Sequence, residues 1–170
     1  MHTQNIQPNV ARKYFVTLSC LLVLFCLRVA GQLLVAICPV PFLPPMQEWQ
    51  SGLLPYSVLV TCQFLIITVF AKVCHDFYNQ NGFFYVPNAA LAEPLMNFGK
   101  AYFVLNSARF LIWTVVLKHY IGFSGTIPIF FHFVLASFLI LVADYHRKAL
   151  ARIVVKNAIP PLLERQKASL

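Results

Sequence analysis

The sequence has little charge and little glycine for its 170 residues. Only 11% of the residues are charged, whereas roughly 25% is usual in a soluble domain. A soluble fold of this size exposes too many positions to be built with so few charges, and a disordered chain has a far lower apolar content. The six glycines form neither a phosphate-binding loop nor the GxxxG spacing that brings membrane helices close together. Soluble and disordered chains are therefore excluded.

Catalytic signatures are also missing. The sequence has no H-E-x-x-H, no G-x-S-x-G and no C-x-x-C among its five cysteines, and it holds only five acidic residues. Zinc proteases, serine hydrolases and thiol–disulfide enzymes depend on these patterns. No motif resembles a known family closely enough to assign residues. The sequence favours a protein that is not an enzyme and leaves the question open.

Apolar residues are abundant: they make up 59% of the chain, and the mean hydropathy is +0.72. Four apolar runs approach or exceed the 20 or so residues that a membrane-spanning helix needs, at 14–40, 55–74, 100–121 and 126–145. The sequence therefore predicts an all-α integral membrane protein whose four transmembrane helices form an up-down bundle. Residues 14–146 are predicted to be its single transmembrane domain.

The distribution of basic residues predicts the orientation. Loop 39–54 contains no Lys or Arg, whereas the tails 1–13 and 147–170 and the ends of loop 75–99 carry them. The positive-inside rule then places both tails and loop 75–99 in the cytoplasm. The expected location is a bacterial inner membrane or an equivalent membrane. The net charge of +8 has no basic-aromatic module beside it, so we expect no nucleic-acid partner.

The basic C-terminal tail predicts a short interfacial helix that ends at Pro160 and Pro161. Its cations are expected to touch anionic lipid headgroups; they are Arg147, Lys148, Arg152 and Lys156. Loop 75–99, rich in aromatic residues, is expected to lie on the membrane interface around an Asn81–Gly82 turn.

Six polar residues fall within the predicted spans, in their middle or outer parts: Arg28, Gln32, Gln63, Asn106, Arg109 and His132. An arginine at a helix centre costs roughly 2.5–3.5 kcal/mol on insertion scales, so such residues usually face the protein interior. We therefore expect Arg28 and Arg109 to converge inside the bundle around an acceptor. The candidate acceptors are Glu48 from the outer loop, a cluster of carbonyl groups or an anion. Interhelical packing, a ligand site and a partner contact all remain open.

Two further sites are weaker candidates. His132 is a candidate axial ligand for haem b, which needs a second imidazole at similar depth. Among the other histidines, His119 approaches that depth only across the outer rim. Cys38 and Cys62 both lie toward the outer face, and the sequence does not decide whether they are bridged.

Three functional hypotheses follow. The leading one is a non-enzymatic accessory or assembly subunit of a larger membrane complex, with lipids and other integral membrane subunits as partners. The second is a binder or carrier of a small anionic or amphiphilic ligand, such as a lipid or quinone, at the polar cluster. The third is a haem-binding redox subunit. No cofactor is predicted under the leading hypothesis.

Overall fold

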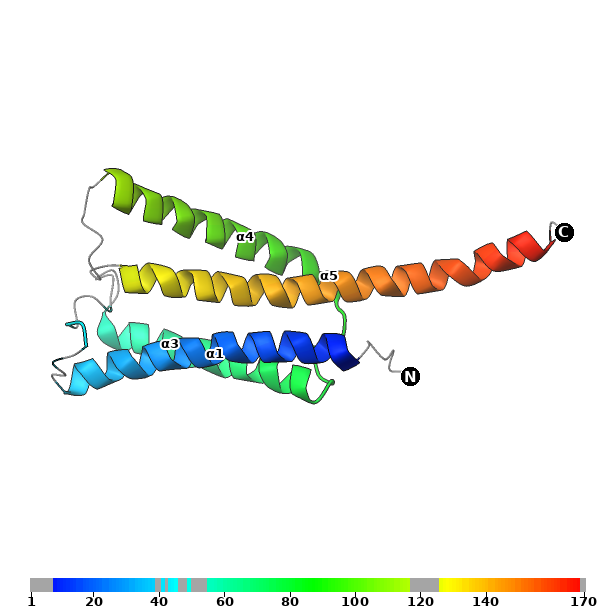
Figure 1. Ribbon diagram of the computed structural model, residues 1–170. Helices are drawn as coiled ribbons and strands as arrows, with labels where there is room; N and C mark the ends of the chain where they lie inside the picture. The colour runs from blue at the N-terminus through cyan, green and yellow to red at the C-terminus, as the bar shows by residue number, and fades with distance from the viewer. Residues whose placement is uncertain are drawn as a thin grey trace.

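The computed structural model describes residues 8–38, 41, 43–45, 49, 55–116 and 126–168. This described part of the chain is helical and contains no strand. Four α-helices and one short π-helical segment follow each other along the chain (Figure 1): α1 (Pro8–Ile37), α3 (Tyr56–Tyr78), α4 (Ala89–Leu111), η1 (Ile112–Val116) and α5 (Thr126–Ala168).

Three of these helices are long and apolar enough to cross a membrane, over Val10–Ile37, Tyr56–Tyr78 and Ile127–Lys156. The protein is therefore an all-helical, multi-pass membrane protein. Helix α4 is not among the three, because Glu93, Lys100 and Arg109 interrupt its apolar residues.

Successive helices run in opposite directions along a common axis (Figure 1). We call the end at which α1 begins, α3 ends and α4 begins the basic end, since Arg147 and Lys148 of α5 lie there; the opposite end is the far end. At the far end α1 finishes and α3 and α5 begin.

Helices α1 and α3 pack against each other through stripes in which core residues alternate at spacings of three and four. The α1 stripe is Ala11, Tyr14, Leu18, Leu21, Phe25, Arg28 and Gln32, and the α3 stripe is Tyr56, Leu59, Gln63, Ile66, Phe70, Val73 and Phe77. This spacing is the one with which helices pack at shallow crossing angles. Phe25 faces Phe70 with ring centroids 6.4 Å apart, and Phe15 faces Tyr78 at 5.4 Å, as antiparallel pairing requires.

Helix α5 is the central element, because it packs on α1, α3 and α4. Phe138 stacks on Phe70 of α3 with ring centroids 3.6 Å apart, and Tyr145 meets Phe77 of the same helix at 4.7 Å. Tyr14 of α1 donates a hydrogen bond to Asp144 of α5 at 2.6 Å. These contacts join α1, α3 and α5 into one three-helix group.

Helix α4 packs on α5 and, among the described residues, on no other α-helix. Its inner side carries small residues: a Cβ at Gly99 would lie 2.8 Å from Ile140, so the two helices approach closely there. Beyond Ser107 most of the described side chains are exposed, and Figure 1 shows α4 leaving α5 toward the far end. The arrangement is thus a three-helix group with α4 attached to one member.

The third predicted span, 100–121, falls partly on α4, which begins eleven residues earlier, and residues 117–121 lie outside the described residues. Helix α4 begins at Ala89, where the side chain of Asn88 caps it by accepting from the Ala90 N–H at 2.9 Å. The predicted loop 75–99 shrinks accordingly to residues 79–88. Hydropathy missed the first half of α4 because that half contains charged and amide residues, whereas the cap and the alanines that follow favour a helix.

The predicted separate interfacial helix is also wrong, because α5 runs without a break from Thr126 to Ala168 through Pro160 and Pro161. The two prolines remove backbone donors but do not end the helix, which curves in its C-terminal third and extends well beyond the other helices (Figure 1).

Candidate functional site

The predicted polar residues on α1 lie in its core stripe. Arg28 is 8% exposed and Gln32 is fully buried, in line with Leu18 and Phe25. A polar residue in this stripe must find its hydrogen bonds inside the protein.

The Arg28 guanidinium has two identified contacts. Nη2 donates to the carbonyl oxygen of Trp49 at 3.0 Å, and the guanidinium carbon lies 5.4 Å from the centre of the Phe131 ring, within cation–π range. A single carbonyl group is thus one acceptor of this arginine. Glu48, the acidic candidate, lies outside the described residues.

Trp49 packs against α1 near the far end. Its indole N–H donates to the carbonyl of Pro44 at 2.9 Å, and its ring is buried against Gly31, where an added Cβ would lie 2.8 Å from the ring. Gly31 therefore leaves the space that brings the Trp49 carbonyl to Arg28.

Gln63 on α3 completes the group on this side. Its Nε2 donates to Oε1 of Gln32 at 2.9 Å, so two buried amides join α1 to α3. Three polar atoms beside these contacts are buried without a hydrogen-bond partner among the described atoms: Arg28 Nε, Gln32 Nε2 and Gln63 Oε1.

The polar residues of α4 and α5 form a second group. Asn106 is buried and donates to the carbonyl of Tyr102, one turn earlier, at 2.8 Å. The Tyr102 hydroxyl bonds Nδ1 of His132 at 2.5 Å and so joins α4 to α5. One ring nitrogen of His132 is therefore occupied by a protein group. His119, the proposed second haem ligand, lies outside the described residues.

The polar group between α1 and α3 and the polar group between α4 and α5 lie at similar levels along the bundle axis. Arg28 of α1 reaches Phe131 of α5, and the neighbouring His132 reaches α4. Because Phe70 pairs with Phe138, the same register of α3 and α5 places Gln63 beside Phe131. Gln63 is about 10 Å along α3 from its first residue, at roughly 1.5 Å per residue. We call this set the polar belt; it comprises Arg28, Gln32, Gln63, Tyr102, Asn106 and His132.

Arg109 does not belong to the polar belt. Its side chain is exposed, on the part of α4 that has left α5, whereas Arg28 is buried. Arg109 is thus exposed in the single chain, and the convergence of the two arginines stays a prediction. The prediction assumed that α4 is enclosed by the other helices, but among the described α-helices α4 contacts only α5.

A polar site at the basic end escaped the sequence reasoning. Asp76 is 2% exposed; it pairs with Lys72 and accepts from the backbone N–H of Phe84 at 3.2 Å. Gly82 lies against this carboxylate with φ +105°, and a Cβ there would lie 2.5 Å from the carboxyl carbon. Asp76 thus anchors loop 79–88, and its place just before the Asn81–Gly82 turn was the available signal.

Helix α5 fastens the other side of this loop. The Tyr145 hydroxyl donates to the carbonyl of Tyr85 at 2.9 Å, and Nδ1 of the fully buried His146 accepts from the Asn88 N–H at 3.2 Å. These contacts fix the position at which α4 begins, and they are structural in character.

The predicted headgroup cations lie on the continuous α5 helix. Arg147 pairs with Glu93 of α4 at 3.3 Å, and Lys148 pairs with Asp144 at 2.7 Å. Arg152 and Lys156 are exposed where the helix extends past its neighbours.

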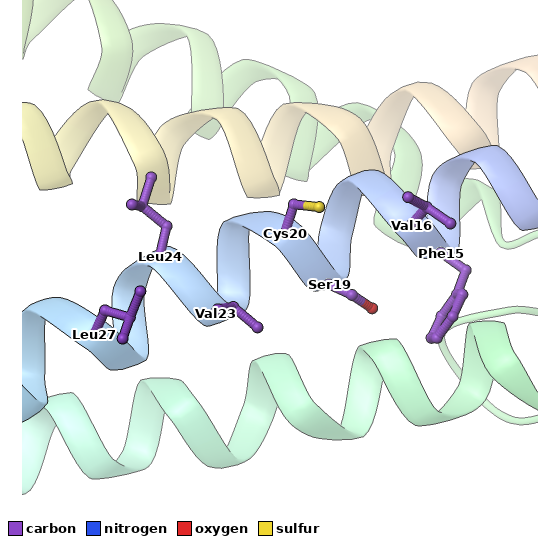
Figure 2. Close-up of a pocket in the computed structure, with 7 residues that line it drawn as sticks. All are labelled: Phe15, Val16, Ser19, Cys20, Val23, Leu24 and Leu27. Atoms are coloured by element: carbon purple, nitrogen blue, oxygen red, sulfur yellow. The ribbon is translucent and has the colours of Figure 1, made fainter.

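A shallow apolar groove of about 400 Å³ runs along α1 on the side opposite its core stripe (Figure 2). It is lined by Phe15, Val16, Ser19, Cys20, Val23, Leu24 and Leu27. This surface suits acyl chains and carries no convergent polar groups. Cys38 and Cys62 are both free and exposed, so no disulfide joins them.

The hydrogen bonds of the polar belt therefore connect helices and support a structural role. Three of its buried polar atoms have no hydrogen-bond partner among the described atoms. Comparison with known proteins adds no assignment: no protein-family model, no curated protein and no solved structure matches this chain.

Proposed function

We propose that this protein is a non-enzymatic accessory or assembly subunit of a larger membrane complex, inserted through four transmembrane helices with both termini and loop 79–88 in the cytoplasm. The observation that carries the proposal is the position of α4, which carries Glu93, Lys100 and Arg109 and, among the described α-helices, packs on α5 only.

A polar membrane helix is normally placed in the interior, because its charged groups are poorly solvated by acyl chains. Here Asn97, Lys100 and Arg109 are exposed on a helix that touches α5 alone. Coverage of α4 by another membrane protein resolves this conflict. The length of α4 with η1 also supports a fourth span, since together they approach 30 residues.

The basic end supports the proposed orientation. Lys72, Arg147, Lys148, Arg152 and Lys156 gather there, as the positive-inside rule requires of a cytoplasmic side.

Purification in a mild detergent followed by native mass spectrometry tests the proposed function. We expect other integral membrane proteins to be recovered at a fixed stoichiometry, and to be lost in a harsh detergent. A homogeneous protein that is recovered alone from a mild detergent would contradict the accessory role.

A second candidate is binding of a lipid or quinone at the polar belt, favoured by the buried and unpartnered atoms of Arg28, Gln32 and Gln63. The same native spectra test it, because a bound amphiphile adds a defined mass. Arg28→Leu should then remove that mass, while Arg109→Leu, which changes an exposed arginine, should retain it. A spectrum without added mass in the unaltered protein contradicts this candidate, and the visible absorbance of the same sample tests for haem b.

A further inference from the structure

We propose that the open side of α4 binds a transmembrane helix of another membrane protein, and that this helix carries a carboxylate at the level of Lys100. The inference rests on the proposed accessory role and names the surface and chemistry of the contact.

The depth of Lys100 is the first step. Gly99 faces Leu139 and Ile140 of α5, so Lys100 lies near the level of Phe138. Phe138 is about 9 Å along α5 from Asp144 and about 16 Å from Ile127, at roughly 1.5 Å per residue. Lys100 therefore begins about 9 Å inside the level of Asp144 and at the level of Lys72 of α3, whose ammonium group pairs with Asp76.

The direction of the side chain is the second step. Successive residues of a helix are separated by about 100°. Ala101 thus lies nearly opposite Gly99, the residue that faces α5, and Lys100 lies between them. Both Lys100 and Ala101 are exposed. A helix that packs on Ala101 approaches α4 closely, as small residues allow in membranes, and meets Lys100 at its flank.

Lys100 has no acidic partner within the described chain, unlike the other cations near its level. The described acidic residues whose side chains are placed lie at the basic end, where each has a cation: Asp76 with Lys72, Glu93 with Arg147 and Asp144 with Lys148. Within the described chain, no acidic group pairs with Lys100. A carboxylate on the covering helix supplies for Lys100 the complementary charge that Asp76 supplies for Lys72 at the same level.

Site-specific photocrosslinking in the native membrane tests this inference. A photoreactive side chain at Ala101 should crosslink to a transmembrane segment that contains Asp or Glu. The control is Ala71 of α3, an exposed alanine beside Phe70 and hence at a similar level, which should yield lipid adducts only. Lipid adducts alone at Ala101, a crosslink to a second copy of this chain, or a segment without an acidic residue would each overturn the inference.

Charge reversal provides the second arm. Lys100→Glu should reduce recovery of the complex at least tenfold, whereas Arg12→Glu, which reverses an exposed cation of α1, should leave it unchanged. Replacing the partner carboxylate with Lys should restore recovery of Lys100→Glu. Recovery that is insensitive to Lys100→Glu overturns the inference while the complex itself still supports the accessory role. Absence of a complex in the unaltered protein removes the accessory role as well.

Discussion

The side-chain amide of Gln63 donates to Oε1 of Gln32 at 2.9 Å, and both residues are buried between α1 and α3. Apart from Arg28 and the tyrosines, the stripes in which these two residues lie are apolar. Its remaining amide atoms, Gln32 Nε2 and Gln63 Oε1, have no described partner. An amide pair of this kind selects one register of the two helices, since any shift along the axis leaves both amides unpaired.

This pair predicts a non-additive response to substitution. Gln32→Met or Gln63→Met alone should lower the free energy of unfolding by about 1 kcal/mol, because the surviving amide is left buried without its partner. The double methionine variant should be at least as stable as the unaltered protein, since it buries no unpaired amide. Reversible unfolding in bicelles measures all four proteins. Additive losses in the double variant would contradict the prediction.

The close contact between Gly31 and Trp49 predicts a steric effect of a larger side chain at position 31. Gly31→Leu should displace the Trp49 ring, because even a Cβ comes within 2.8 Å of that ring. We expect a red-shifted tryptophan emission and stronger quenching by a soluble quencher, measured in a Trp113→Phe background. Ala30→Leu, at the exposed neighbouring position, is the matched control and should leave the spectrum unchanged. Equal spectra for the two leucine variants would show that Trp49 does not pack on Gly31.

The buried contacts of Asp76 predict that loop 79–88 opens more often when this carboxylate is removed. Asp76→Ala removes the acceptor of the Phe84 N–H, and an unpaired buried donor costs about 1–3 kcal/mol. Amide hydrogen exchange in residues 79–88 should then be faster by roughly 5- to 150-fold. Glu93→Gln, which breaks an exposed ion pair at the same end, should change the exchange of this loop far less. Unchanged exchange in Asp76→Ala would contradict its anchoring role.

The proposed orientation predicts which sites an impermeant reagent reaches. Single cysteines at Asn81 and Leu170, in a cysteine-free background, should react only from the cytoplasmic side. Cysteines at Glu48 and Gly122 should react only from the opposite side. An even number of crossings requires the two termini to agree. Labelling of Asn81 and Leu170 from opposite sides would overturn the four-span topology.

Sequence reasoning succeeded where a helix must face lipid. The runs that became α1, α3 and the first half of α5 are apolar on nearly all sides, so hydropathy alone located them. The polar residues Arg28, Gln32 and Gln63 stood out against these runs for the same reason.

The sequence was least informative where tertiary contacts decide the start of a helix or the burial of a side chain. The side chain of Asn88 caps the start of α4, and the helix packs against α5. The position at which α4 begins therefore does not depend on hydropathy. The exposure of Arg109 follows from which helices touch α4, which no pattern along the chain records. Asp76 is buried by a loop that folds back on it, and its role depends on the path of that loop.

The continuity of α5 has a mechanical consequence. One uninterrupted helix of 43 residues, about 64 Å long at 1.5 Å per residue, carries Ile129 and His132 near one end and Arg152 and Lys156 beyond the other helices. A helix transmits tilt and axial rotation along its length because its backbone hydrogen bonds resist local deformation. A tilt imposed on α5 at Arg152 would therefore be carried to the Phe138 stack and to the His132 contact with α4.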